Sequence, residues 1–224
     1  MLAIVEPAVL ILVPIALLLC ALFATGVTTL LTFVVAVVAI VPFFARFERG
    51  GMRPRDIMPV VVLAALAVAS RMVFALLPNS KPFSAIIIVA GACFGKRSGF
   101  MVGALAALVS NMFFGQGPWT PWQMYLFGMM GYMAGVLASR GWLKKPWVGC
   151  LYGAVATLLF GILFDTYFVV AYLHAASWQS ALVGYAGGLP FNVMHTVSTV
   201  VFLALIYAPW TSKLTRIKAK YGIV

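Results

Sequence analysis

The sequence predicts an all-α membrane protein, a polytopic bundle of about eight transmembrane helices. The chain has 224 residues, of which 64% are hydrophobic and only 8% are charged, a balance that soluble domains of this size do not tolerate. Most of its apolar runs approach the roughly 20 residues that a helix needs to cross a bilayer. The runs are continuous rather than alternating, which disfavours a membrane β-barrel.

The apolar segments that we expect to cross the membrane are spread along the whole chain. Their ranges are residues 2–22, 27–45, 58–77, 83–94, 99–114, 122–139, 147–172 and 189–208. The fourth is short, because twelve helical residues rise only about 18 Å against a hydrocarbon core of about 30 Å. A tilted or re-entrant piece is one alternative. We favour a true crossing, since a re-entrant segment would reverse the sidedness of every later loop.

The basic residues predict the orientation of the bundle. If the loop that contains residues 46–55 is cytoplasmic, eight crossings place all but two of the 15 Lys and Arg on the inner side. The outer loops near residues 25–26, 115–121 and 173–188 contain neither residue type. The positive-inside rule therefore predicts that both termini are cytoplasmic. The net charge of +11 is then explained by topology and anionic lipid, and nucleic acid is not expected as a partner.

The two exceptions to this charge pattern, Arg71 and Lys81, fall on the predicted outer side. Other polar residues at membrane depth, including Asp165, fall on the same side. Ionisable groups within a membrane are costly and usually face a partner or a cavity. We therefore predict a pocket that opens to the outside. An ion pair between Arg71 and Asp165 that only braces the bundle is the alternative.

An uncharged segment, residues 110–124, joins two apolar segments on the predicted outer side. Its Gly and Pro residues restrict the backbone, so residues 115–121 are expected to form the rim or lid of the pocket. The indoles of Trp119 and Trp122 are expected to be apolar walls, although Trp also anchors proteins at membrane interfaces. The predicted substrate-binding residues are Arg71, Asn79, Lys81, Asn111, Gln116, Trp119, Trp122, Gln123, Asp165, Asn192 and His195.

The chain lacks the motifs of common catalytic sites. It has no Gly-rich nucleotide-binding loop with a Lys, no zinc-hydrolase motif and only one acidic residue deep in the apolar core, Asp165. The three Cys lie in apolar runs without metal-ligand spacing and are expected to pack as small apolar residues. We therefore expect neither an enzyme nor a metal site nor a bound cofactor.

Several motifs of the chain resemble those of the substrate-binding S component of an energy-coupling factor (ECF) transporter. They are residues 65–71, 76–82, 99–103, 110–124, 187–195 and 213–222, so the resemblance covers nearly the whole chain. It implies a six-helix core over residues 57–210, followed by a basic cytoplasmic tail over residues 211–224. Residues 1–50 would be two extra N-terminal helices, which is similar to one branch of the family.

The resemblance also implies a mechanism and partners. Such a subunit captures a vitamin outside a bacterial cell membrane, docks on a membrane coupling subunit (the T component) and is driven by two ATPase subunits. The small-residue face at Ala65 and Ala69 is then expected to contact the T component. On spacing alone, internal helix packing is the favoured role of these alanines, and contact with another membrane protein is the alternative.

The substrate that the resemblance favours is cobalamin or a related corrinoid, for which a wide, Trp-bearing mouth is suited. A metal-ion substrate is not expected, because the chain begins Met-Leu-Ala-Ile and lacks the Met-x-His type of N-terminus. Riboflavin, thiamin, biotin, folate and queuosine precursors stay open, and the carboxylates of biotin or folate would prefer Arg71 or Lys81. A structural membrane protein without a ligand is the contrasting class.

Overall fold

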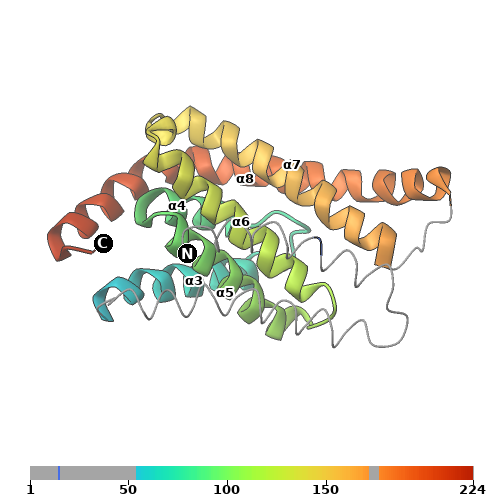
Figure 1. Ribbon diagram of the computed structural model, residues 1–224, viewed down its shortest axis with the longest axis horizontal. Helices are drawn as coiled ribbons and strands as arrows, with labels where there is room; N and C mark the ends of the chain where they lie inside the picture. Colours follow the sequence, from blue (N-terminus) through green and yellow to red (C-terminus); the bar gives the residue numbers. More distant parts are fainter. Residues whose placement is uncertain (1–14, 16–53, 172–176, 224) are drawn as a thin grey trace.

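The computed structural model describes residue 15, residues 54–171 and residues 177–223. Within these ranges the chain forms six α-helices and one short 3-10 helix, and no strand (Figure 1). The elements are α3 (Pro54–Val73), α4 (Phe83–Phe94), α5 (Lys96–Phe114), α6 (Thr120–Ser139), η1 (Trp142–Lys144), α7 (Pro146–Ala171) and α8 (Trp178–Tyr221). The all-helical prediction is confirmed for this part. The predicted segments 2–22 and 27–45 lie outside it.

Four of the described helices, α3, α5, α7 and α8, are long and apolar enough to cross a membrane. The helix α6 has 20 residues but is not among them, and α4 has only 12. The polytopic membrane character of the chain is therefore supported, whereas the number of eight crossings and the location of the termini stay predictions.

The short helix α4 lies at the centre of the bundle. It packs against α3, α5, α6, α7 and α8, and most of its side chains are buried. Because α4 is surrounded by protein rather than lipid, its length does not have to match the bilayer. It is followed directly by α5, and Gly95 alone links the two with a φ of 88°, a conformation that side-chain-bearing residues rarely adopt.

Glycines allow α5 and α6 to pack backbone against backbone. A Cβ atom on Gly99 would overlap the carbonyl oxygen of Gly131, and a Cβ atom on Gly131 would overlap the carbonyl oxygen of Gly99. A Cβ atom on Gly103 would likewise overlap the backbone of Phe127, and a Cβ atom on Gly135 would overlap the backbone of Lys96. This is the close approach that small residues permit between membrane helices.

The last helix, α8, differs most from the prediction. It has 44 residues, so it extends about 66 Å, more than twice the hydrocarbon thickness. Residues 178–188 were predicted as part of an outer loop and residues 211–221 as a tail, and both stretches are helical. The loop prediction was wrong because Gly187, Gly188 and Pro190 are typical of a helix break. Instead, the helix continues through them from its capping box at Ser177 and Ser180.

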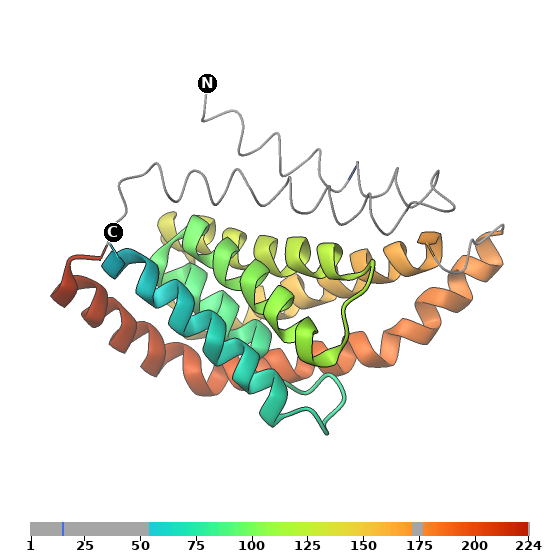
Figure 2. The same cartoon turned by 90° about the horizontal axis from the view of Figure 1, so that it is seen from below.

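The bundle has two distinct ends (Figure 2). At the basic end, α3 begins beside the end of α8, and the Arg55 guanidinium lies next to Gly222. The α6–α7 connection, with Lys144 and Lys145, is at this end too. At the opposite end, which we call the pocket end, lie the loop of residues 74–82, the loop of residues 115–119 and the end of α7.

Candidate functional site

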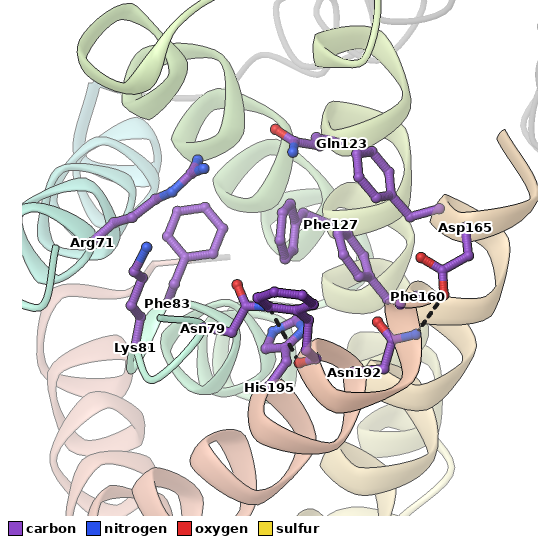
Figure 3. Close-up of a pocket in the computed structure, with 13 residues that line it drawn as sticks. Arg71, Asn79, Lys81, Phe83, Gln123, Phe127, Phe160, Asp165, Asn192 and His195 are labelled. Atoms are coloured by element: carbon purple, nitrogen blue, oxygen red, sulfur yellow. Dashed lines mark hydrogen bonds between the residues drawn. The ribbon is translucent and has the colours of Figure 1, made fainter. Parts of the chain in front are cut away.

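A cavity of about 300 Å³ lies at the pocket end. It is polar at two sides and aromatic between them (Figure 3). The chain contributes to it from α3, the loop of residues 74–82, α4, α6, α7 and α8. Its lining residues are Arg71, Asn79, Lys81, Phe83, Gln123, Phe127, Phe160, Phe164, Asp165, Gly188, Phe191, Asn192 and His195.

One side of the cavity is cationic. Arg71, in the last turn of α3, donates hydrogen bonds from Nη1 to Ser110 Oγ at 2.6 Å and to Asn111 Oδ1 at 2.9 Å. Its guanidinium lies 4.8 Å from the ring centre of Phe114, and the Lys81 ammonium lies 5.2 Å from the same ring. Burial, together with the neighbouring Arg71 guanidinium, lowers the pKa of Lys81. The two cations are therefore close enough to repel each other.

The facing side of the cavity carries a carboxylate and an amide. Asp165 on α7 accepts a hydrogen bond of 2.6 Å from the side-chain nitrogen of Asn192 on α8. Two glycines make room for this pair. A Cβ atom on Gly188 would overlap the Asp165 carboxylate, and a Cβ atom on Gly161 would overlap the Asn192 amide. At these two glycines, α7 and α8 thus hold polar side chains, whereas Gly99 and Gly131 bring the backbones of α5 and α6 together.

Aromatic rings separate the two polar sides. Phe127 packs against Phe83 with ring centres 4.7 Å apart and against Phe160 at 4.2 Å. The ring centres of His195 and Phe160 lie 5.4 Å apart with the two rings almost perpendicular, and one ring nitrogen of His195 lies 2.7 Å from the Ser84 hydroxyl. This arrangement suits a flat, unsaturated ring system, because aromatic faces and edges pack well against another π system.

The loop of residues 74–82 is tied to α8 next to the cavity. Asn79 adopts a positive φ of 49°, which Asn tolerates better than most residues. Its side-chain nitrogen donates to the backbone oxygen of Phe191 at 3.2 Å. This contact fixes the loop that carries Lys81 to the helix that carries Asn192.

A second polar cluster lies behind the cavity and is centred on Asn111, which is only 1% exposed. Its side-chain nitrogen donates to Thr120 Oγ1 at 3.1 Å and to Gln123 Oε1 at 2.7 Å, while its oxygen accepts from Arg71. The Thr120 hydroxyl in turn donates to Gln116 Oε1 at 2.8 Å. The Asn111 cluster therefore satisfies its own hydrogen bonds, and it positions Arg71 and Gln123 from behind.

The structure divides the predicted binding residues into two groups. Seven of them line the cavity, namely Arg71, Asn79, Lys81, Gln123, Asp165, Asn192 and His195. The other four, Asn111, Gln116, Trp119 and Trp122, do not line it. Asn111 and Gln116 belong to the Asn111 cluster. Whether any of the eleven contacts a substrate stays a prediction.

Both indoles lie away from the lining of the cavity. Trp122 is 2% exposed and packs against the ring of Tyr167 at 5.2 Å. Trp119 packs on Gly117 within the loop. Thr120 and Pro121, expected in the rim, form the first turn of α6. The two indoles therefore do not form the predicted walls of this cavity, because the ring of each Trp packs within the protein.

The predicted alternative of an ion pair between Arg71 and Asp165 was wrong for the described part of the chain. Arg71 donates hydrogen bonds to Ser110 and Asn111. Asp165 lies on the opposite side of the cavity and accepts a hydrogen bond from Asn192. The sequence also gave no signal for the aromatic residues of the lining. A Phe in an apolar helix has the same pattern whether it faces lipid or a cavity, and only the fold distinguishes the two.

Two further hollows offer poorer sites. A groove of about 390 Å³ between α6 and α7 is lined almost wholly by apolar side chains, among them Met133 and Leu159. It provides few directed hydrogen bonds and therefore little selectivity. A smaller hollow of about 220 Å³ at the basic end surrounds Tyr207 and Cys93. Within the described ranges, no three His, Cys, Asp or Glu residues are grouped as metal ligands would be.

Residues 51–212 match the family described as the ECF-type riboflavin transporter, S component. This range contains every residue that lines the cavity. No curated protein and no solved structure matches the chain significantly.

Proposed function

Because the chain belongs to the family of S components of ECF-type riboflavin transporters, we propose that its cavity captures a flavin for import into the cell. The family consists of transport proteins rather than enzymes, and its members bind a vitamin within a cell membrane. The observation that carries the proposal is the cavity at the pocket end, which combines stacked Phe rings with polar groups at both sides. That combination fits a flat heterocycle with hydrogen-bonding edges.

The substrate is proposed to be a flavin rather than the cobalamin favoured by the sequence resemblance. The description of the matching family names riboflavin. A cavity of about 300 Å³ also lies at the lower end of the range for small-molecule sites, roughly 300–1,000 Å³. A fused three-ring vitamin suits that size, whereas a corrin macrocycle with its nucleotide tail does not. Cobalamin thus becomes a comparison ligand in the test.

The pocket end is proposed to face the outside of the cell. Among the described basic residues, Arg71 and Lys81 are at this end, while those of the α6–α7 connection and of the end of α8 are at the basic end. The positive-inside rule places the basic end in the cytoplasm. Substrate would then enter from the outside and leave after the subunit has docked on its partners.

The partners are proposed to be a T component and two ATPase subunits, as the family implies. Ala65 and Ala69 lie exposed on α3, next to the exposed side chains of Val61, Val62 and Leu66. This surface is small and apolar at its centre, which allows another membrane helix to approach closely. Replacing both alanines by Leu should abolish copurification with the T component while leaving flavin binding unchanged. Val183→Leu, at an exposed position of α8, is the control.

The proposal is tested by titrating the purified chain with riboflavin and following flavin fluorescence. We expect saturable one-to-one quenching with a dissociation constant below about 1 µM, or about −8.2 kcal/mol. Asn192→Leu in the cavity should weaken binding at least tenfold, about 1.4 kcal/mol. Leu159→Ala in the α6–α7 groove should leave it unchanged. Failure to bind any flavin, with cobalamin or no vitamin binding instead, would contradict the proposal.

A further inference from the structure

The two cations of the cavity have no ionic partner in the described part of the chain. The sequence has four Asp and Glu, of which Asp56 and Asp165 are described. Asp56 is in the first turn of α3 and Arg71 in the last, which separates them by about 22 Å along the helix axis. Asp165 is hydrogen-bonded to Asn192 on the facing side. Neither described carboxylate thus neutralises Arg71 or Lys81.

With respect to the described residues, both cations also keep hydrogen-bond donors for a ligand. A guanidinium has five N–H donors, and Arg71 uses Nη1 for its two bonds to Ser110 and Asn111. Lys81 has three N–H donors, and among described residues its ammonium contacts only the face of the Phe114 ring. Two neighbouring cations in a partly buried site are costly, because they repel each other and lose contact with water. An anion placed between them would remove that cost.

From this geometry we infer that the transported molecule carries an anionic group, a carboxylate or a phosphate, which binds between Arg71 and Lys81. Its ring system lies along Phe127 and Phe160, and an N–H or O–H donor at its other end binds the Asp165 carboxylate. Figure 3 shows the two cations on one side of the cavity and Asp165 with Asn192 on the other. The inference deepens the proposed function, since it specifies the charge of the ligand that the same cavity binds.

A structural role explains the presence of Arg71 better than that of Lys81. Arg71 braces α3 against α5 through Ser110 and Asn111, so part of its role is structural. Among the described residues, the Lys81 ammonium makes no such bond, yet Lys81 lines the cavity beside Arg71. Lys81 is therefore the residue at which a role in ligand charge recognition can be separated from a role in folding.

The test compares two flavins that differ only in charge. Riboflavin and flavin mononucleotide share the same ring system, and only the second carries a phosphate. We expect flavin mononucleotide to bind the wild-type protein at least tenfold more tightly than riboflavin. Lys81→Gln should abolish that preference by weakening flavin mononucleotide binding more than riboflavin binding, and Lys81→Arg should retain it. Lys144→Gln, at the exposed basic end, should change neither affinity.

Two outcomes would overturn the inference. One is riboflavin binding as tightly as flavin mononucleotide, and the other is Lys81→Gln weakening both ligands equally. Arg71→Gln is a second variant, with its unfolding temperature measured alongside because Ser110 and Asn111 lose a partner. Loss of the phosphate preference in a folded Arg71→Gln protein supports the inference, and its retention in both single variants contradicts it.

A second set of ligands separates this inference from the proposed function. If neither flavin binds, the flavin proposal fails, and thermal-shift titrations with nicotinate and nicotinamide, pantothenate and panthenol, and biotin and biotinamide replace it. Preferential stabilisation by the anionic member of a pair, lost in Lys81→Gln, upholds the anionic site. No preference in any pair overturns it.

A lipid headgroup also carries a phosphate, which could bind between the two cations in place of the phosphate of a soluble ligand. Binding is therefore measured in nanodiscs of phosphatidylcholine and in nanodiscs containing phosphatidylglycerol. A preference for flavin mononucleotide that is equal in both supports a soluble anionic ligand. A preference that disappears with phosphatidylglycerol would show that lipid occupies the cation pair, and it would overturn the inference.

Discussion

Gly99 and Gly131, in α5 and α6, serve a different purpose from Gly161 and Gly188, in α7 and α8. Gly99 and Gly131 let two backbones touch, so nothing else fits between their helices. Gly161 and Gly188 instead make room for the side chains of Asn192 and Asp165. The comparison suggests that one half of the bundle is a closely packed frame. In the other half, the space at Gly161 and Gly188 holds two polar side chains beside the cavity.

The largest effect is expected from a single methyl group in the frame. Gly131→Ala places a Cβ atom onto the backbone carbonyl of Gly99, which cannot move independently of α5. We expect a destabilisation of about 3 kcal/mol, the upper end of overpacking costs. Thermal unfolding in detergent measures it. Gly187→Ala is the matched control, because no described atom lies near its Cβ position. Equal stability of the two variants would contradict a frame held by glycine contacts.

The next largest effect is expected at Asn111. Asn111→Leu keeps a similar volume but removes one hydrogen bond from each of Arg71, Thr120 and Gln123. A loss of about 2–3 kcal/mol in unfolding free energy is expected, because unsatisfied buried polar groups cost about 1–3 kcal/mol each. Gln116→Leu, at an exposed position, should cost less than about 1 kcal/mol. Comparable melting temperatures for the two variants would argue against a buried, self-satisfied cluster.

A smaller change in stability, with a clear change in binding, is expected at Gly188. Gly188→Ala forces the Asp165 carboxylate away from its position beside Asn192. Flavin affinity should fall about tenfold, or about 1.4 kcal/mol, whereas the melting temperature changes little because a side chain rather than backbone yields. Gly187→Ala is again the control. If Gly188→Ala retained its flavin affinity, the Asp165 carboxylate would not be part of the binding site.

The smallest effect is expected at Trp119, which sequence analysis placed in the wall of the pocket. Its ring packs on Gly117 and does not line the cavity. Trp119→Ala should change flavin affinity less than about threefold, or about 0.7 kcal/mol. A fluorescence titration measures this change. A hundredfold loss of flavin affinity would show that Trp119 belongs to the binding site.

The helices of the core were largely predictable because long apolar runs identify membrane helices directly. The fourth segment was predicted with the same bounds as α4, Phe83–Phe94. The segments that became α3, α5, α6 and α7 differ from prediction by only a few residues at most ends. Helix α8 was missed over much of its length, since Gly187, Gly188 and Pro190 break helices in most contexts but not inside this packed pair.

The polar residues of the site were predictable as a set but not as individuals. Position relative to the membrane correctly grouped Arg71, Lys81 and Asp165 at one end of the bundle. Sequence could not tell that Asn111 satisfies its neighbours while Asp165 faces a cavity, because that depends on which helices adjoin. The Phe residues of the lining were missed for the same reason. Charge and polarity are local properties of a sequence, whereas burial depends on packing.

A ligand-bound structure of the flavin complex tests the central claim most directly. We predict ligand density in the cavity at the pocket end, with its ring along Phe127 and Phe160 and its edge at Asp165 and Asn192. Density in the apolar α6–α7 groove, or against Trp119 in the loop of residues 115–119, would contradict it. Either result would show that the cavity between the two polar sides is not where this protein captures its substrate.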